Sequence, residues 1–154
     1  MFYFDTSFTI PKYIKEATSD KIEAILLSLP PEQLVISQWT RVEFSSMLAR
    51  RVRMQELTDE QALQVLASFE QDVRDSFHII VPNVADFELA IHFLHQPQTG
   101  LRAGDALHLA ISKNDGIKMF YTLDNGLIKA ASLLNIPATS GISEERHKHK
   151  EITS

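Results

Sequence analysis

Four acidic residues occupy positions where a carboxylate calls for a chemical explanation. Asp5 directly follows a short aromatic run, and Asp124 lies just beyond a later apolar run. Glu43 and Asp105 lie inside segments with helical periodicity. An aspartate at the end of a strand is often only the N-cap of the next helix, so this interpretation stays open for Asp5 and Asp124.

Glu43 and Asp105 fall on the apolar faces of their predicted helices. Glu43 shares one stripe with Trp39 and Met47, and Asp105 begins a stripe that continues through Leu109. Residues three or four apart lie on the same side of a helix, so both acids point toward packed side chains. An acid there is costly unless it is paired or bound to a metal ion. For Glu43 the structural alternative is a partly buried pair with an arginine.

Brought together, the four acids would favour a site for hard cations. Two carboxylates about 5 Å apart repel by about 3 kcal/mol at an effective dielectric of about 20, so a fold gains nothing by gathering four of them unless cations occupy the gap. Ligation by carboxylate oxygens alone suits Mg²⁺ or Mn²⁺ rather than Zn²⁺. Such clusters recur where two metal ions clamp the attacking and leaving oxygens of a phosphodiester.

Hydroxyl groups accompany two of these acids. Thr6 and Ser7 follow Asp5, and Thr122 stands two residues before Asp124, on the same side of an extended segment. Such hydroxyls can orient carboxylates or hold metal-bound water, although Thr and Ser are also ordinary residues at strand ends.

Other chemistry is weakly represented. His108 follows Asp105 by three residues and is either a partner of the site or a core histidine; both interpretations stay open. The chain contains no cysteine, which excludes a thiolate zinc site, an iron–sulfur cluster and a cysteine nucleophile. It also has no glycine-rich phosphate loop and no nucleophile elbow.

The segments that must position these residues alternate between short apolar runs and longer amphipathic ones. The short runs predict strands over 2–4, 34–36, 78–81, 118–122 and, as an edge strand, 136–138. Helical periodicity predicts helices over about 20–29, 40–53, 84–95, 102–112 and 127–134, and one more that begins at a capping box of Thr58 and Gln61. Asp5-Thr6-Ser7 is predicted to be a turn, and Asn135 a left-handed helix cap.

This alternation predicts an α/β fold with a parallel sheet. The functional crevice of such a sheet lies at the carboxyl ends of its strands. Asp5 and Asp124 then lie at the ends of central strands. Glu43 and Asp105 are expected on helices that follow strands, within reach of the same crevice.

Composition sets the class of protein. The 154 residues are enough for one domain and include 15 Lys and Arg against 20 Asp and Glu, a net charge of −5. This balance argues against a general nucleic-acid binder, because affinity for phosphates comes largely from cations. No apolar run could span a membrane and no signal peptide precedes the domain, so we expect a cytoplasmic protein. We expect one domain over 1–142 and a polar, mobile tail over 143–154.

Four short motifs occur in order along most of the chain. They are Phe4-Asp5-Thr6-Ser7, Arg41-Val42-Glu43-Phe44, Leu101-Arg102-Ala103-Gly104-Asp105-Ala106-Leu107-His108-Leu109-Ala110 and Thr122-Leu123-Asp124. Together they resemble the PIN-domain nucleases, and within these the small single-domain VapC-type toxins of bacterial and archaeal toxin–antitoxin pairs.

The resemblance implies a three-layer α/β/α sandwich around a mostly parallel sheet of four to five strands. It also implies a homodimer, inhibition by a cognate antitoxin protein, and endoribonuclease activity that depends on Mg²⁺ or Mn²⁺. By matched position, Asp5, Glu43, Asp105 and Asp124 would be the catalytic, metal-binding quartet that hydrolyses RNA phosphodiester bonds. Asp5 and Asp105 would be the surest metal ligands.

Two alternatives compete with this hypothesis. A non-catalytic PIN-like module would act only through a protein partner. The presence of four mutually repelling acids argues against this alternative, because an inactive site has no reason to keep them. An aspartyl-phosphate phosphatase of the haloacid-dehalogenase kind also has an Asp after its first strand. That chemistry requires a second acid two residues later, where this chain has Ser7.

The partners suggest further surfaces. An antitoxin segment is expected to lie across apolar side chains such as Ile14, Ile25 and Leu66 and to bring a basic side chain toward the acids. Basic residues that could contact RNA, or could simply form a solvated face, are Lys12, Lys15, Arg50, Arg51, Arg53 and Arg102.

Overall fold

The computed structural model describes residues 1–142 of the chain. The predicted tail over 143–154 lies outside these residues, so the boundary at 142 stays a prediction. Within the described part, five strands form one sheet in the order β3-β2-β1-β4-β5, and each neighbouring pair is parallel. The strands are β1 (Phe2–Phe4), β2 (Leu34–Ser37), β3 (His78–Ile80), β4 (Met119–Tyr121) and β5 (Ala138–Thr139).

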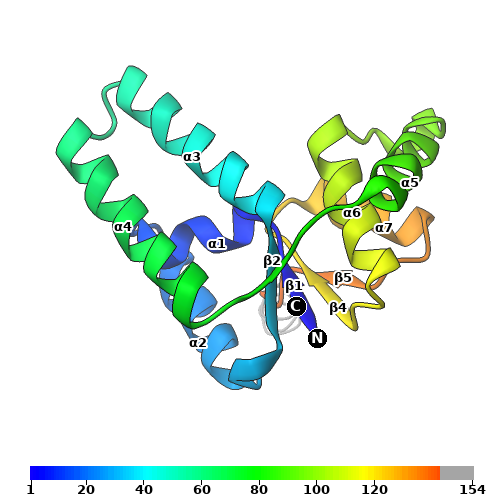
Figure 1. Cartoon of the computed structure of the whole chain (residues 1–154), viewed down its shortest axis with the longest axis horizontal. Coiled ribbons are helices and arrows are strands. Elements are labelled where there is room, and N and C mark those ends of the chain that lie inside the picture. Colours follow the sequence, from blue (N-terminus) through cyan, green and yellow to red (C-terminus); the bar gives the residue numbers. More distant parts are fainter. Residues whose placement is uncertain (143–154) are drawn as a thin grey trace, which may run out of the picture.

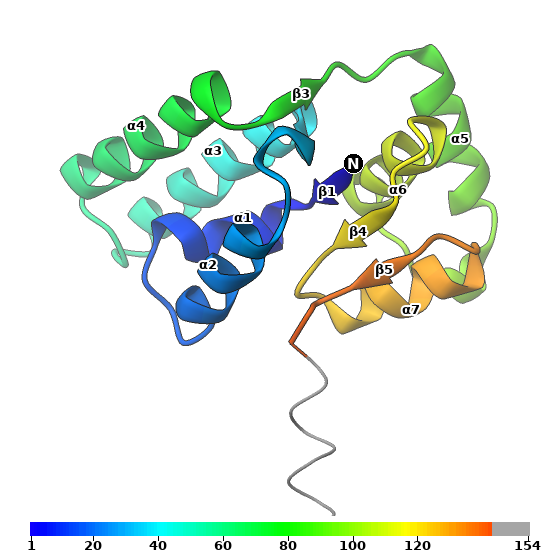
Figure 2. The same ribbon diagram turned by 90° about the horizontal axis from the view of Figure 1, so that it is seen from below.

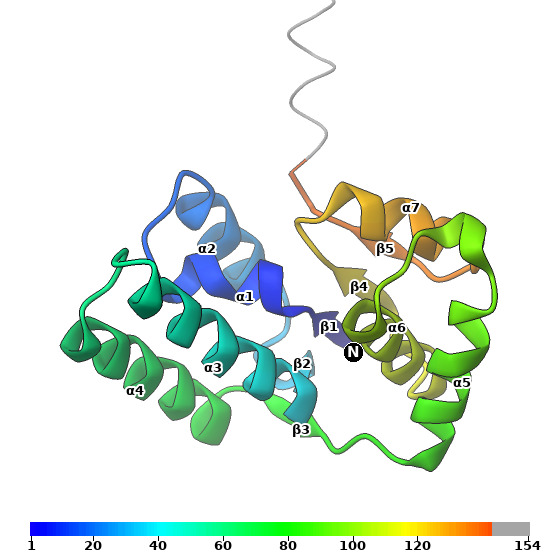
Figure 3. The same ribbon diagram turned by 90° about the horizontal axis from the view of Figure 1, so that it is seen from above.

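Two layers of helices enclose this sheet (Figure 1). Figure 2 and Figure 3 show helices α1 to α4 on one side of it and α5 to α7 on the other. The helices are α1 (Thr6–Tyr13), α2 (Ser19–Ser28), α3 (Gln38–Arg53), α4 (Asp59–Asp75), α5 (Val84–Leu94), α6 (Ala103–Asn114) and α7 (Asn125–Leu133), with short 3-10 helices η1 (Pro31–Gln33) and η2 (Pro97–Thr99). The predicted three-layer α/β/α fold is confirmed. None of the helices in residues 1–142 is long and apolar enough to cross a membrane.

Side chains alternate across the sheet and so build two separate cores. In β1, Tyr3 packs into the core formed with α5, α6 and α7, whereas Phe4 packs into the core formed with α1 to α4. In β2, Val35 and Ile36 divide in the same way. All four side chains are fully buried, so a slip of one residue in either strand would exchange the two faces.

Local capping rules account for most helix starts. Ser37 and Thr40 form a capping box at the start of α3, and the predicted box of Thr58 and Gln61 opens α4. Asn135 has a φ of 58° just after α7, as predicted for a left-handed cap. These interactions fix where the amphipathic segments begin and end.

Two predicted elements are wrong in part. The segment predicted to be a turn after Asp5 instead begins α1, and this helix continues through Pro11. Burial of Phe8 and Pro11 in the core outweighs the cost of about 3 kcal/mol that proline imposes inside a helix. The edge strand β5 starts at Ala138 rather than at 136. Its predecessor Pro137 contributes only a carbonyl, which accepts a hydrogen bond from the Phe120 N–H at 3.0 Å.

Candidate active site

A cleft of about 740 Å³ lies at the carboxyl edge of the sheet, and all four predicted acids line it. Asp5 directly follows β1, and Asp124 lies three residues after β4. Glu43 lies in the second turn of α3, which follows β2, and Asp105 lies in the first turn of α6. Four separate segments of the chain therefore deliver one acid each to the same place.

Asp105 reaches this edge by a different route from the one expected. The expectation that its helix follows a strand is wrong, because α5 and η2 separate α6 from β3. Instead, α6 leads directly into β4, which is parallel to β1. A helix that precedes a parallel strand and packs on the sheet must start at the carboxyl edge, so its first turn lies beside the acid that follows β1.

Asp5 is a helix cap and a cleft residue at once. Its Oδ1 accepts hydrogen bonds from the Phe8 N–H at 3.0 Å and from the Ser7 hydroxyl at 2.8 Å. The residue is only 4% exposed. Burial raises the pKa of Asp5, although the charge of His108 and the hydrogen bonds act in the opposite direction. The cap and the site are thus not alternatives for this residue.

The hydroxyls that follow β1 and β4 connect the two halves of the cleft. Ser7 Oγ lies 3.2 Å from Thr122 Oγ1, which accepts a hydrogen bond from the Asp124 N–H at 3.1 Å. Asp124 is exposed and is the N-cap of α7, where its Oδ1 accepts from the Gly126 N–H at 2.9 Å and the Leu127 N–H at 3.2 Å. The predicted orienting role of these hydroxyls is visible in this network.

Glu43 is held by two donors that both bind one of its oxygens. Its Oε1 accepts a hydrogen bond from the Thr6 hydroxyl at 2.6 Å and another from His108 Nε2. Burial acts to raise the pKa of Glu43, but the hydrogen bond and charge of His108, together with Thr6, hold it below its usual value. The partner of this acid is therefore a histidine, where the sequence suggested an arginine.

His108 is the residue whose role the sequence left open. It is 1% exposed and belongs to the core, yet its Nε2 contacts Glu43 and its Nδ1 lies 2.6 Å from the Tyr3 hydroxyl. The spacing of three from Asp105 was the available signal, since it places both residues on one side of α6. Nothing in the aromatic run at the N-terminus distinguished Tyr3 from an ordinary core residue.

The first turn of α6 lies close to the Glu43 side chain. A Cβ atom added to Gly104 would lie 2.8 Å from Glu43 Oε2 and 3.4 Å from the Trp39 ring, so glycine permits the approach. Burial raises the pKa of Asp105, and so do the charges of Asp124 and Glu43, against the opposing effect of nearby cations. Repulsion among the acids is thus concentrated at this turn.

The chemistry of the donors fits a hard divalent cation, since all four acids offer carboxylate oxygens to one cleft. As they stand, these carboxylates do not form a ready metal site. No group of three or more acidic or histidine side chains in residues 1–142 is arranged to hold a metal ion. The Asp105 carboxylate has no hydrogen-bond partner within the described residues, so no hydrogen bond there fixes its rotamer.

Basic side chains also line the cleft that contains the four acids. The candidate RNA contacts that line the cleft are Arg50, Arg53 and Arg102. Lys12 is instead paired with Asp72 at 3.3 Å, and Arg51 with Glu16 at 2.8 Å. A neighbouring hollow of about 510 Å³ shares Arg102, Asp105 and Asp124 with the cleft and adds Lys129.

The sequence matches the PIN domain family over residues 2–133. No curated protein matches it. The fold is similar to that of FitAcB from Neisseria gonorrhoeae, with a TM-score of 0.74 and 19% identity over 93% of this chain and 99% of that one. It is also similar to Mycobacterium tuberculosis VapC20, described as a sarcin–ricin loop cleaving toxin (TM-score 0.69, 20% identity, 84% and 95% covered). A third similar structure is VapBC-1 of nontypeable Haemophilus influenzae (TM-score 0.64, 15% identity, 92% and 98% covered).

The raised pKa of Asp105 predicts a pH-dependent cost of stability. Because the folded protein holds this proton more tightly than the unfolded chain does, stability falls as pH rises from about 4 through the folded pKa. Asp105→Asn keeps the shape of the side chain but cannot ionise. In EDTA we therefore expect this variant to gain thermal stability relative to wild type near neutral pH, and to gain less below about pH 4.

Thermal melting of both proteins across this pH range measures the difference. Glu88→Gln, which removes an exposed acid of α5 outside the cleft, serves as the matched control. A stability difference for Asp105→Asn that is independent of pH would contradict the prediction.

Proposed function

This chain belongs to the PIN domain family, and from that premise we propose that it is a metal-dependent endoribonuclease acting as the toxin of a toxin–antitoxin pair. The convergence of Asp5, Glu43, Asp105 and Asp124 on one cleft carries the proposal. The cleft partly desolvates these acids, and burial raises the pKa of both Asp5 and Asp105. A cation bound between them would relieve that cost.

The proposed metal is Mg²⁺ or Mn²⁺. Asp5 and Asp105 would hold it, with Glu43 and Asp124 binding directly or through water, and the ion would supply Lewis acidity and acidify a coordinated water. Since the acids do not form a ready group of three within residues 1–142, the metal would be bound after side-chain movement or with the help of bridging water. The unpaired Asp105 carboxylate is the group best able to move.

The chain's own side chains define where the reaction takes place. Asp5 Oδ1 and Glu43 Oε1 are occupied by donors, so the second oxygen of each carboxylate is the one left for the cleft. Arg102 lies at the rim, where it can bind the phosphate of the substrate. The lowered pKa of Glu43 favours the ionised form that a metal ligand needs. As water attacks the phosphorus in line, its proton would pass to solvent or to a carboxylate of the cleft, and the leaving 3′ oxygen would take a proton from solvent.

RNA is proposed to bind through local cations, because the chain as a whole carries a net charge of −5. Arg50 and Arg53 flank the acids on the α3 side, and Lys129 flanks them on the α7 side. A strand lying along the cleft and its neighbouring hollow would place one phosphate beside the acids and the next ones beside these cations.

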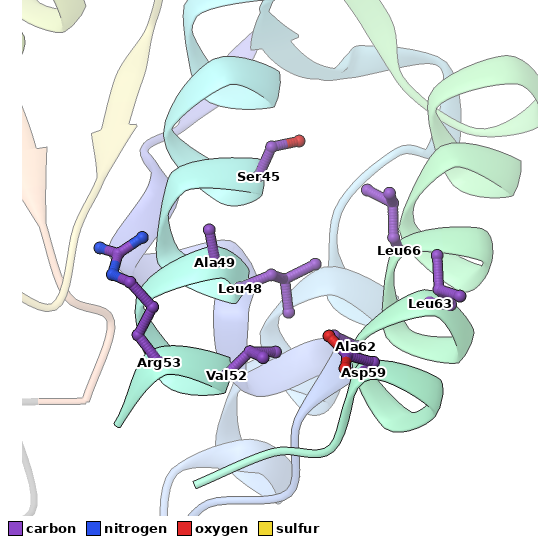
Figure 4. A pocket seen from close by; sticks show the side chains of 9 residues that line it. All are labelled: Ser45, Leu48, Ala49, Val52, Arg53, Asp59, Ala62, Leu63 and Leu66. Atoms are coloured by element: carbon purple, nitrogen blue, oxygen red, sulfur yellow. The ribbon is translucent and has the colours of Figure 1, made fainter. Parts of the chain in front are cut away.

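The antitoxin is proposed to bind in the groove between α3 and α4. This groove of about 440 Å³ is lined mainly by apolar side chains, among them Leu48, Val52, Leu63 and Leu66 (Figure 4). Arg53 lines both the groove and the acidic cleft, so a segment docked here leads into the site. Ile14, Ile25 and Leu66 are all half-buried against the core, and of these three residues expected from the sequence only Leu66 lines this groove. Similar structures include a toxin–antitoxin complex from Klebsiella pneumoniae.

A second copy of the chain is proposed to bind at α5. Exposed apolar side chains recur along one stripe of this helix, with Val84 at 76%, Phe87 at 51% and Ile91 at 48% exposure, followed by Leu94 at 39%. Such a stripe suits a two-fold interface, in which the same patch serves on both subunits. It lies on the opposite side of the sheet from the α3–α4 groove, so both partners fit at once.

Loss of an acid should remove RNA cleavage without unfolding the protein. In Asp5→Asn the amide oxygen can still cap α1, yet the negative charge is lost. We expect Mg²⁺-dependent cleavage of RNA to fall by about 10²–10³-fold, the usual cost of losing one electrostatic contact to a transition state. Gel analysis of cleaved RNA with Mg²⁺ and with EDTA measures this.

Glu88→Gln is the control and should cleave like wild type. If wild type binds a protein partner but leaves RNA intact with either metal, the chain is a non-catalytic PIN-like module.

A charge placed in the α3–α4 groove should abolish binding of the antitoxin. Leu63 is 67% exposed, so Leu63→Glu should leave the thermal midpoint within about 2–4 °C of wild type. Co-expression with any small protein that an adjacent reading frame is found to encode, followed by size-exclusion chromatography, measures binding. Leu27→Glu, on α2 and 77% exposed, is the matched control. Binding retained by Leu63→Glu would move the partner site elsewhere.

A charge in the α5 stripe should dissociate the homodimer. Phe87→Glu places a carboxylate where two copies would bury an aromatic ring, so we expect a monomer by sedimentation velocity. Leu133→Glu, an exposed change on α7, should remain dimeric. If Phe87→Glu sediments like wild type, the stripe is not the dimer interface.

A further inference from the structure

A buried chain of hydrogen bonds runs from the core of the sheet to the acidic cleft. Ser37 Oγ lies 2.8 Å from the Tyr3 hydroxyl, which lies 2.6 Å from His108 Nδ1. The other ring nitrogen of His108 contacts Glu43 Oε1. Ser37, Tyr3 and His108 are each at most 1% exposed, so water cannot replace any of these contacts.

The chemistry of the carboxylate fixes the donor at one end of this chain. A carboxylate only accepts hydrogen bonds, so His108 Nε2 must donate to Glu43. The Tyr3 hydroxyl can satisfy His108 Nδ1 in either protonation state of the ring, as a donor to the neutral imidazole or as an acceptor from the imidazolium. The Tyr3 ring is itself fixed by stacking on Phe120, with centroids 5.4 Å apart and planes 12° apart. The imidazole is thus held from both sides.

The chain determines which oxygen of Glu43 remains available. Oε1 accepts from both His108 and Thr6, whereas Oε2 lies beside the first turn of α6, where Gly104 leaves room for it. The N-cap residue of α6, Arg102, provides no side-chain cap, so the positive end of this helix also favours a carboxylate here. A Glu43 without His108 would keep only one of its two anchors on Oε1.

We propose that His108 and Tyr3 are positioning residues that lock the Glu43 carboxylate, with Oε2 presented to the metal-binding cleft. This inference rests on the proposed function, because it assigns these residues to the same site. If His108 and Tyr3 had a purely structural role, it would be enough that each buried polar group has a hydrogen-bond partner. The positioning role requires in addition that changes at Tyr3, which does not line the cleft, alter binding at Glu43.

Mg²⁺ binding to the full-length protein tests this without any need for turnover. Trp39, the single tryptophan, lines the cleft, and its fluorescence can report titration with Mg²⁺. We expect His108→Leu to weaken Mg²⁺ binding by about 10–100-fold, as is usual when a partner of a metal ligand is lost. His108→Gln should recover most of the affinity, because its amide N–H can still donate to Glu43.

Tyr3→Phe removes the distal contact while keeping the ring. It should weaken Mg²⁺ binding by less than His108→Leu does, through the loosened imidazole. Ser112→Ala, one turn further along α6 and also buried, is the matched control and should bind Mg²⁺ like wild type. Urea unfolding of each variant identifies any that fail to fold, and Tyr3→Phe then carries the test if His108→Leu is among them.

A metal-free measurement separates this inference from the proposed function. In the ¹⁵N-histidine and ¹³C-glutamate NMR spectra, Tyr3→Phe should shift both the His108 ring nitrogens and the Glu43 carboxyl carbon. Unchanged Glu43 resonances, or equal Mg²⁺ affinity in wild type, His108→Leu and Tyr3→Phe, would overturn the positioning role. If wild type neither binds Mg²⁺ nor cleaves RNA, the proposed function fails, and the NMR result alone decides the inference.

Discussion

Like charges held together at one edge of a parallel sheet are the constraint on which this structure depends. Three of the four acids are held by hydrogen bonds within the protein. Asp5 and Asp124 accept from backbone N–H groups at helix starts, and Glu43 accepts from a hydroxyl and an imidazole. Among residues 1–142 Asp105 has no such partner, and its pKa is raised by burial and by its neighbours. The remaining repulsion therefore falls on the acid with the greatest freedom to move.

Helix capping and the lining of the cleft draw on the same positions, which explains why the sequence could predict that these acids meet at one edge of the sheet. At a strand-to-helix turn of a parallel sheet, the favoured cap residue also lies at the carboxyl edge where ligands bind. Asp5 and Asp124 show this directly, because each caps a helix with one oxygen. The two interpretations that the sequence left open, helix cap and site residue, are compatible with each other because a carboxylate has two oxygens.

What the sequence could not predict depended on tertiary contacts. The helix α1 was missed because Pro11 opposes it locally, and only packing of the whole layer stabilises it. Asp105 was placed at the correct edge for the wrong reason, since periodicity shows a helix but not the route by which the chain enters it. The contact of His108 with Tyr3 joins residues 105 positions apart, and no local pattern encodes such a pair.

The cleft carries both signs of charge, and this bears on how one site could serve two partners. A phosphate strand would use the arginines at the rim, whereas a basic side chain from an antitoxin would use the acids beneath them. The sign of the charge in the cleft therefore excludes neither the RNA strand nor the antitoxin side chain. We propose that they exclude each other through space, because Arg53 lines both the groove between α3 and α4 and the cleft. A segment that runs from the groove past Arg53 would cover part of the cleft that the RNA strand needs, and inhibition would then follow from overlap rather than from charge repulsion.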